Sequence, residues 1–100
     1  MENTIKILEE KTKLPWVAVD NSSNIEAYSY NSESKELWVL FKKNRANHQW
    51  VYVYHNISKD QLDDLQKAES KGKWVNANLI KPGIKYDKYE LVIKDSKFYE

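Results

Sequence analysis

The most regular pattern of hydrophobic positions lies in the middle of the chain, in the run Trp-Val-Tyr-Val-Tyr at residues 50–54. In an extended chain the three aromatic rings fall on one side and the two valines on the other. Because β-branched and aromatic side chains favour a pleated, half-buried surface, the run predicts a strand. Its three aligned rings are either part of the core or a platform that binds a ligand.

Two similar stretches precede this strand and predict its neighbours. Residues 25–30 and 36–42 are rich in aromatic and β-branched residues, and short polar connections separate the three stretches. This spacing is typical of an antiparallel meander. A short apolar run at 16–19 is expected to be extended, and residues 84–93 are expected to return along the sheet. The pattern therefore predicts a three- to four-stranded antiparallel sheet.

The clearest helix start is at Ser58. Ser58 and Gln61 have the spacing of a capping box, while Ile57 and Leu62 occupy the two positions of a hydrophobic staple. One main helix is therefore predicted over residues 58–69.

Two shorter helices are predicted elsewhere. A second helix is expected within residues 70–80, because a Pro-Gly pair follows it. An N-terminal helix is expected over residues 3–13, capped by Asn3 or Thr4 and ended before Pro15. Together with the sheet, these helices predict an α+β fold in a single domain over residues 1–100.

Both faces of the predicted central strands are apolar. In the strand at 36–42 the residues that point one way are Leu37, Val39 and Phe41, and those that point the other way are Trp38 and Leu40. A sheet with one wet face would alternate with polar residues instead, so the second face must be covered. The N-terminal helix with Ile5 and Leu8, the apolar run at 16–19, the C-terminal strand and a second copy of the chain are all candidates. A homodimer would use the Trp38/Val51 face.

Composition narrows the classes of function. The chain has 100 residues, 13% aromatic residues and a net charge of +1, which disfavours a strongly cationic duplex-DNA binder. It has no Cys, which excludes disulfides, thiolate nucleophiles and cysteine zinc sites. The sequence has neither a signal-peptide pattern nor a membrane-length apolar stretch, so a cytoplasmic protein is expected.

Positive charge gathers in two places despite the near-neutral total. Five lysines and one aspartate lie between residues 71 and 88, and Lys42, Lys43 and Arg45 form a second basic group. Basic residues interleaved with Trp74, Tyr86 and Tyr89 are typical of surfaces that bind single-stranded nucleic acid, with cations for phosphate and rings for bases. The alternative is a solvated lysine-rich surface with the aromatic residues in the core.

The sequence Ser70-Lys71-Gly72-Lys73 has two interpretations. It lacks the upstream glycine of a nucleotide-hydrolysing loop. If Ser70 caps a helix, the free amides of the first turn form an anion site beside the two lysines. Otherwise the glycine permits a kink between two helices.

No catalytic or metal site is expected. His48 and His55 flank the aromatic strand without a third metal ligand or a recognisable triad. Asp60, Asp63 and Asp64 are explained by the favourable helix dipole at an N-terminus. The chain is therefore not expected to be an enzyme or to carry a cofactor.

Several of these residues occur in the order of a known family. The matching residues are Asp20-Asn21-Ser22-Ser23-Asn24-Ile25, Tyr30, Leu37-x-Val39-x-Phe41, Tyr52-x-Tyr54, Leu65-x-x-Ala68-x-Ser70-x-Gly72-Lys73-Trp74-x-Asn76 and Ile80. This pattern resembles the KTSC domain, named for the C-terminus of some lysyl-tRNA synthetases. The resemblance covers about residues 17–86 and implies a compact domain with an RNA-binding role. The extra N- and C-terminal segments, Asn21 before the serines, and the apolar Trp38 and Val51 depart from the family pattern.

Together these observations predict a non-enzymatic binding domain for RNA or another phosphate-bearing nucleotide. One alternative is a bacterial or phage decoy that sequesters a small nucleotide signal as a homo-oligomer, and another is a protein–protein adaptor or inhibitor. The expected phosphate-binding residues are Ser22, Ser23, Ser70, Lys71, Gly72, Lys73 and Asn76. The expected stacking or site-lining residues are Tyr52, Tyr54, Trp74 and Tyr86.

Overall fold

The computed structural model describes residues 2–20, 22, 24–42, 49–94 and 97–99. Within these residues one helix is followed by four strands, then by the remaining helical segments, and finally by two strands. In chain order the elements are α1 (Glu2–Thr12), β1 (Trp16–Ala18), β2 (Ile25–Asn31), β3 (Glu36–Phe41), β4 (Gln49–Tyr54), α2 (Lys59–Lys67), α3 (Lys71–Val75), the π-helical segment η1 (Asn76–Ile80), β5 (Tyr86–Lys94) and β6 (Lys97–Tyr99).

The strands form an antiparallel meander in the order β1-β2-β3-β4-β5-β6. The first five strands pair successively in one sheet, and β6 pairs with the far end of β5. The predicted α+β class is confirmed, but the strand number is larger than the three or four expected. The apolar run at 16–19, expected to be extended, forms β1, and the further strand β6 is only three residues long, too short for an alternating pattern to identify it.

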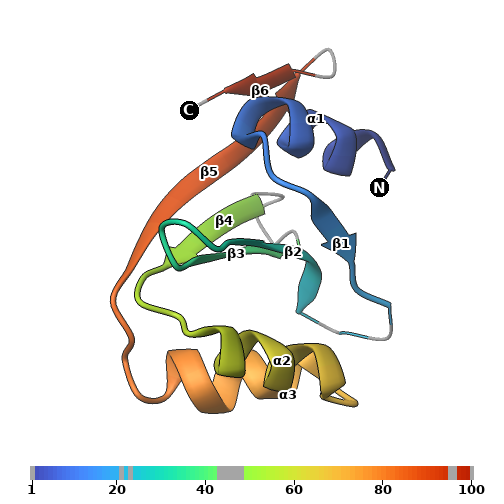
Figure 1. Cartoon of the computed structure of the whole chain (residues 1–100). Coiled ribbons are helices and arrows are strands. Elements are labelled where there is room, and N and C mark those ends of the chain that lie inside the picture. Colours follow the sequence, from blue (N-terminus) through green and yellow to red (C-terminus); the bar gives the residue numbers. More distant parts are fainter. Residues whose placement is uncertain (1, 21, 23, 43–48, 95–96, 100) are drawn as a thin grey trace.

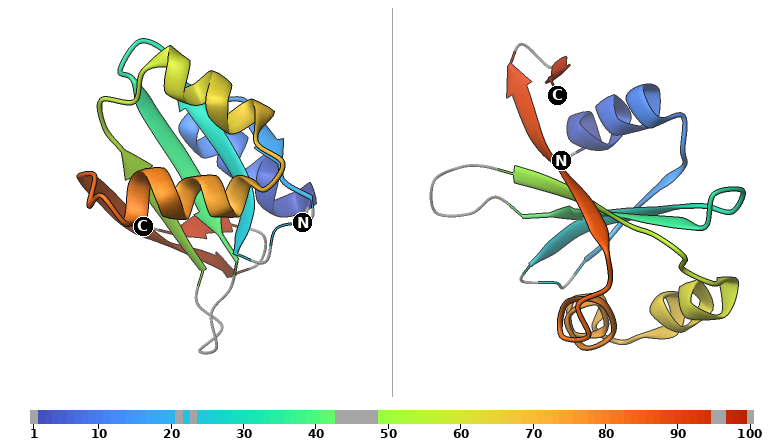
Figure 2. Two further views of the ribbon diagram at one scale, coloured as in Figure 1. Left: turned by 90° about the horizontal axis from the view of Figure 1, so that it is seen from below. Right: turned by 90° about the vertical axis from the view of Figure 1, so that its left-hand side faces the viewer.

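Helices cover both faces of the sheet. α2 and α3 lie side by side on one face, and α1 lies on the opposite face, as Figures 1 and 2 show. The long strand β5 crosses between these layers (Figure 1).

The first core lies between the sheet and the two C-terminal helices. Leu37 and Val39 point into it from β3, as their alternation predicted, and Tyr54 joins them from β4. The other buried members are Val19, Ile25, Tyr28, Ile57, Leu65, Val75 and Leu79.

The second core lies between the sheet and α1. Its buried residues are Leu8, Trp16, Ala27, Leu40 and Val51, with Ile5 and Trp38 packed against them. Of the four candidates for covering the second apolar face, the N-terminal helix and the run at 16–19 therefore both contribute side chains to this core.

Hydrogen bonds fix α1 to β1. The Thr12 hydroxyl accepts a bond from Trp16 Nε1 at 3.0 Å and donates one to the Leu8 carbonyl at 2.6 Å. The helix begins at Glu2, so Asn3 and Thr4 lie inside it and the cap predicted at these positions is wrong.

The predicted capping box of α2 is confirmed. Ser58 Oγ accepts from the Gln61 amide at 3.2 Å, and Gln61 Oε1 accepts from the Ser58 amide at 2.9 Å. The second helix also starts as expected, because the Ser70 side chain accepts from the Lys73 amide. It then widens into η1, where the Lys81 amide bonds the Asn76 carbonyl at 2.9 Å. No sequence pattern indicated this π-helical turn.

Candidate ligand-binding site

Of the predicted phosphate-binding residues, Ser22 and Gly72 meet near the start of α3, and Ser22 and Lys71 form hydrogen bonds with neighbouring residues of the chain. Ser22 is buried, and its hydroxyl accepts from the amides of Asn24 at 3.3 Å and Ile25 at 3.0 Å. The same hydroxyl donates to Asn24 Oδ1 at 3.0 Å. Ser22 therefore stabilises the turn that leads into β2.

Gly72 lies directly against this turn. A Cβ atom at residue 72 would overlap Asn24 Oδ1 and lie 2.8 Å from Ser22 Oγ. Glycine is required by this close approach between α3 and the turn. Gly72 lies inside α3, which Ser70 caps, so it does not form a kink between two helices, and the anion site at the first turn stays a prediction. The closeness of residues 22 and 72 is a packing contact.

Lys71 also has an internal role. Its ammonium donates to the main-chain carbonyls of Gln66 at 3.4 Å and Ala68 at 3.3 Å, at the C-terminal end of α2. A cation at this position favourably complements the helix dipole. Lys73 and Asn76 are exposed, and Ser23 lies outside the described residues.

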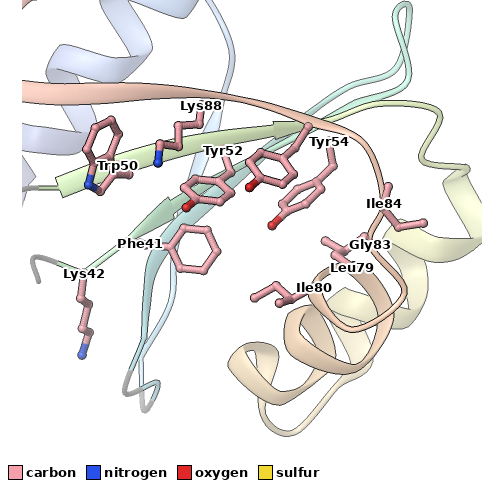
Figure 3. Close-up of a pocket in the computed structure, with 11 residues that line it drawn as sticks. Phe41, Lys42, Trp50, Tyr52, Tyr54, Leu79, Ile80, Gly83, Ile84 and Lys88 are labelled. Carbon is pink, nitrogen blue, oxygen red and sulfur yellow. The ribbon is translucent and has the colours of Figure 1, made fainter.

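A separate open cleft of about 580 Å³ lies between the sheet and η1. Figure 3 shows aromatic side chains from the sheet facing the apolar residues of η1 and the loop after it. The residues that line it are Phe41, Lys42, Trp50, Tyr52, Tyr54, Leu79, Ile80, Gly83, Ile84, Tyr86 and Lys88. Gly83, with a φ of 73°, adopts the left-handed conformation that turns the chain towards β5.

Four rings form a contiguous aromatic wall in this cleft. Tyr52 stacks on Tyr86 with ring centroids 4.7 Å apart and an interplanar angle of 14°, and Phe41 meets Tyr52 edge-on at 4.8 Å. Tyr54 lies 5.6 Å from Tyr86. Three of the four residues predicted to line the site, Tyr52, Tyr54 and Tyr86, thus lie together. Trp74 instead packs partly buried against the first core and does not line this cleft.

Pairing of β4 with β5 assembles the wall. Tyr54 lies opposite Tyr86, and Tyr52 lies opposite Lys88. Because side chains opposite each other point to the same face of a sheet, these residues converge from segments far apart in sequence. Sequence reasoning did not identify Phe41, Lys42 and Lys88 as cleft residues. If the register between β4 and β5 had been known, the alternation along β5 would have identified Lys88.

The aromatic wall changes from buried to exposed along its length. Tyr54 is 1% exposed, whereas Tyr86 is 49% exposed. Burial raises the pKa of the Tyr54 hydroxyl well above its ordinary value, and the neighbouring Tyr52 and Tyr86 add to this effect. Tyr54 therefore belongs to the floor of the cleft, and Tyr86 presents its ring to solvent.

Two lysines line the cleft together with Trp50. The Lys88 ammonium lies over the Trp50 ring, 4.5 Å from its centroid, and Lys42 is exposed nearby (Figure 3). The earlier Ser70–Lys73 cluster lies at the opposite end of the α3–η1 segment. At a rise of about 1.5 Å per residue, the eight residues from Gly72 to Ile80 separate the two regions by roughly 12 Å.

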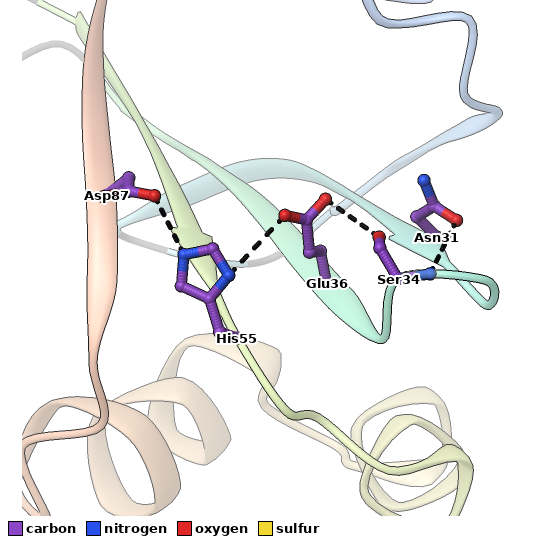
Figure 4. A network of polar contacts seen from close by, with 5 residues as sticks. All are labelled: Asn31, Ser34, Glu36, His55 and Asp87. Atoms are coloured by element: carbon purple, nitrogen blue, oxygen red, sulfur yellow. Dashed lines mark hydrogen bonds and ion pairs between the residues drawn. The ribbon is translucent and has the colours of Figure 1, made fainter.

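His55 forms a bridge at one end of the sheet. Its Nε2 lies 2.9 Å from Asp87 Oδ2 and its Nδ1 lies 3.5 Å from Glu36 Oε2 (Figure 4). The Ser34 hydroxyl donates to the other oxygen of Glu36 at 2.9 Å. A carboxylate thus separates the serine from the imidazole, so the arrangement lacks the serine–base contact of a hydrolase and instead connects β3, the end of β4 and β5. His48 lies outside the described residues.

The Trp38/Val51 face is largely covered within the chain. Val51 is buried beneath α1, while Trp38 is half-buried and stacks on Tyr89 at 6.3 Å. The sheet therefore does not require a second copy to cover this face, and self-association through it stays a prediction.

The described residues contain neither a cluster of metal ligands nor a membrane-spanning helix. Among them, no group of three or more His, Cys, Asp or Glu residues is arranged to hold a metal ion. In the same part of the chain, no helix is long and apolar enough to cross a membrane.

The fold and the cleft define a small α+β domain whose antiparallel sheet presents an aromatic wall beside a helix. The KTSC domain family model matches residues 21–83, and the chain belongs to this family. The predicted resemblance is therefore confirmed. No curated protein matches the chain.

A solved structure supports the fold. The crystal structure of a KTSC domain protein from Yersinia pestis is 21% identical in sequence and superimposes with a TM-score of 0.62, covering 76% of this chain and 97% of that chain. The family match includes Phe41, Trp50, Tyr52 and Tyr54, but it ends before Tyr86 and Lys88. Part of the cleft wall thus lies outside the matched region.

Proposed function

We propose that the protein is a non-enzymatic binding domain for RNA or another phosphate-bearing nucleotide, and that the aromatic cleft takes a base. The observation that carries this proposal is the row of rings flanked by Lys42 and Lys88 along one open cleft. Its volume of about 580 Å³ lies in the range of about 300–1,000 Å³ that is usual for small-molecule sites.

The rings supply the binding energy for a base. Stacking on an aromatic side chain contributes about 1–3 kcal/mol per base and tolerates any base, because each has a π face. Tyr86 is the most accessible ring of the wall, with Trp50 and Tyr52 half-buried beside it. A base that enters the cleft would stack on these rings and contact Ile80 on the opposite side.

The lysines supply the complementary charge. Lys42 and Lys88 are exposed, so their ammonium groups can reach a phosphate attached to a base inside the cleft. Lys71, in contrast, already bonds two carbonyls of α2. The proposal therefore moves the phosphate contacts from the Ser70–Lys73 segment to the cleft.

Titration with a short oligouridylate, followed by tryptophan fluorescence and by backbone NMR shifts, tests the proposal. We expect shifts to concentrate at the cleft, and affinity to fall as salt rises because phosphate binding releases counterions. Lys42→Ala/Lys88→Ala should weaken binding and flatten the salt slope, whereas Lys71→Ala/Lys73→Ala should change both much less. Shifts absent from the cleft, or a stronger effect of the second double variant, would refute it.

A thermal-shift assay distinguishes RNA from a small nucleotide signal as the natural ligand. A ligand that binds only the folded state raises Tm in proportion to the logarithm of its concentration relative to Kd. If the natural ligand is RNA, the oligouridylate should stabilise the protein at lower concentration than mononucleotides or cyclic dinucleotides do. The reverse order would favour a protein that sequesters a small nucleotide signal.

A further inference from the structure

The contact between Lys88 and Trp50 has a consequence for ligand choice. The Lys88 ammonium lies 4.5 Å from the centroid of the Trp50 ring, and both side chains line the cleft. Trp50 lies opposite Glu90 in the register, and Lys88 lies opposite Tyr52, so the lysine reaches the indole diagonally across the two strands. Figure 3 shows the two side chains next to each other at one end of the cleft.

The lysine occupies the surface that a base would use. Ammonium groups and nucleobases both bind to the π face of an indole ring. Because Trp50 and Lys88 face the same cleft, a base can stack on this face of Trp50 only after the ammonium has left it. In the free protein, Lys88 therefore competes with the ligand for the ring.

A phosphate on the ligand removes this competition. A charge-assisted bond between an ammonium and a phosphate oxygen is stronger than an exposed cation–π contact. A nucleotide can thus draw Lys88 away from Trp50 and stack on the ring that it vacates. A nucleoside must displace the lysine without offering it another partner.

We infer that Lys88 is a specificity-determining residue that makes the cleft select phosphate-bearing nucleotides over the corresponding nucleosides. The inference rests on the proposed function and assigns opposite effects on the two ligands to one side chain. Lys42 provides the matched comparison, because it also lines the cleft and is exposed, but no ring contact is found for it within the described residues.

The test compares Lys88→Leu and Lys42→Leu with the unmodified chain, using adenosine and AMP as probes in NMR titrations. For Lys88→Leu we expect adenosine to bind about two- to fivefold more tightly, since it no longer competes with the ammonium. The same variant should bind AMP about tenfold more weakly, since a charged phosphate contact is lost. Lys42→Leu should weaken AMP binding without improving adenosine binding.

Two failures can be told apart. If the unmodified chain binds neither AMP nor the oligouridylate at the cleft, both the proposed function and this inference are overturned. If it binds them, but Lys88→Leu leaves adenosine affinity unchanged or lowers it, only the role of Lys88 is overturned. Circular dichroism of each variant tests whether a lost affinity comes from unfolding. Because residues 42 and 88 are exposed, we expect both variants to stay folded.

Discussion

Replacing Gly72 by alanine tests whether the glycine of the Ser70–Lys73 segment serves packing. The added methyl group would overlap Asn24 Oδ1 and lie 2.8 Å from Ser22 Oγ. Asn24 can rotate away only by giving up its bond from the Ser22 hydroxyl, and that hydroxyl is itself held by the amides of Asn24 and Ile25. The turn therefore cannot move aside without loss of hydrogen bonds.

The expected cost follows from three contributions. Alanine in place of glycine stabilises a helix by at most about 1 kcal/mol. Overpacking a close contact costs about 1–3 kcal/mol, and loss of the bond between Ser22 and Asn24 adds about 1 kcal/mol. The net result is a decrease of about 2 kcal/mol in the free energy of unfolding. For a domain of this size, that decrease lowers Tm by about 10 °C.

Thermal and urea unfolding of Gly72→Ala, with and without Asn24→Ala, measures this cost. Asn24→Ala removes the atom that the new methyl group would overlap, so Gly72→Ala should cost less than half as much in that background. A Tm that is unchanged or raised by Gly72→Ala alone would show that residues 22 and 72 do not constrain each other.

Two further predictions concern the cores. Leu8→Ala should lower the free energy of unfolding by about 3 kcal/mol in urea titrations, because Leu8 is fully buried against the sheet. Ile7→Ala, at a half-buried position of the same helix, should lower it less. Equal decreases for the two variants would contradict the packing of α1. Burial raises the pKa of the Tyr54 hydroxyl, so above about pH 10 the folded state keeps a proton that the unfolded chain loses. The free energy of unfolding should therefore fall as pH rises above about 10, by up to ~1.4 kcal/mol per pH unit. Tyr54→Phe should flatten this slope, and an unchanged slope would refute the assignment.

Sequence patterns over a few neighbouring residues correctly predicted the start of α2 and the two faces of β3. The capping box at Ser58 depends on residues three apart, and the alternation in β3 depends only on the pleat of a strand. The two apolar faces of β3 also predicted that the second face is covered, because an uncovered apolar face would be unstable in water. Ile5 and Leu8 of the N-terminal helix were among the candidates for the cover, but the sequence did not distinguish them from the other candidates.

Long-range pairing determined what the sequence left open. The composition of Ser70–Lys73 is equally compatible with an anion site and with a glycine-permitted kink, and it gives no indication of the close approach of Gly72 to Ser22. Lys88 became a cleft residue because β5 pairs with β4 in a register that places it opposite Tyr52. Neither fact follows from spacing along the chain, since each joins segments more than 30 residues apart.

The origin of the cleft residues limits how far the proposed function extends. Tyr52 and Tyr54 lie within the matched KTSC region, whereas Tyr86 and Lys88 lie beyond its end at residue 83. Without β5, Tyr52 would lose its stacked partner, and Trp50 would lose the lysine that covers it. The matched region alone therefore supplies rings but neither the exposed end of the wall nor the Lys88 ammonium. Nucleotide selection at this cleft is consequently a property proposed for this chain. It extends to other KTSC domains only where a strand after the helix places an aromatic residue opposite the equivalent of Tyr54 and a lysine opposite the equivalent of Tyr52.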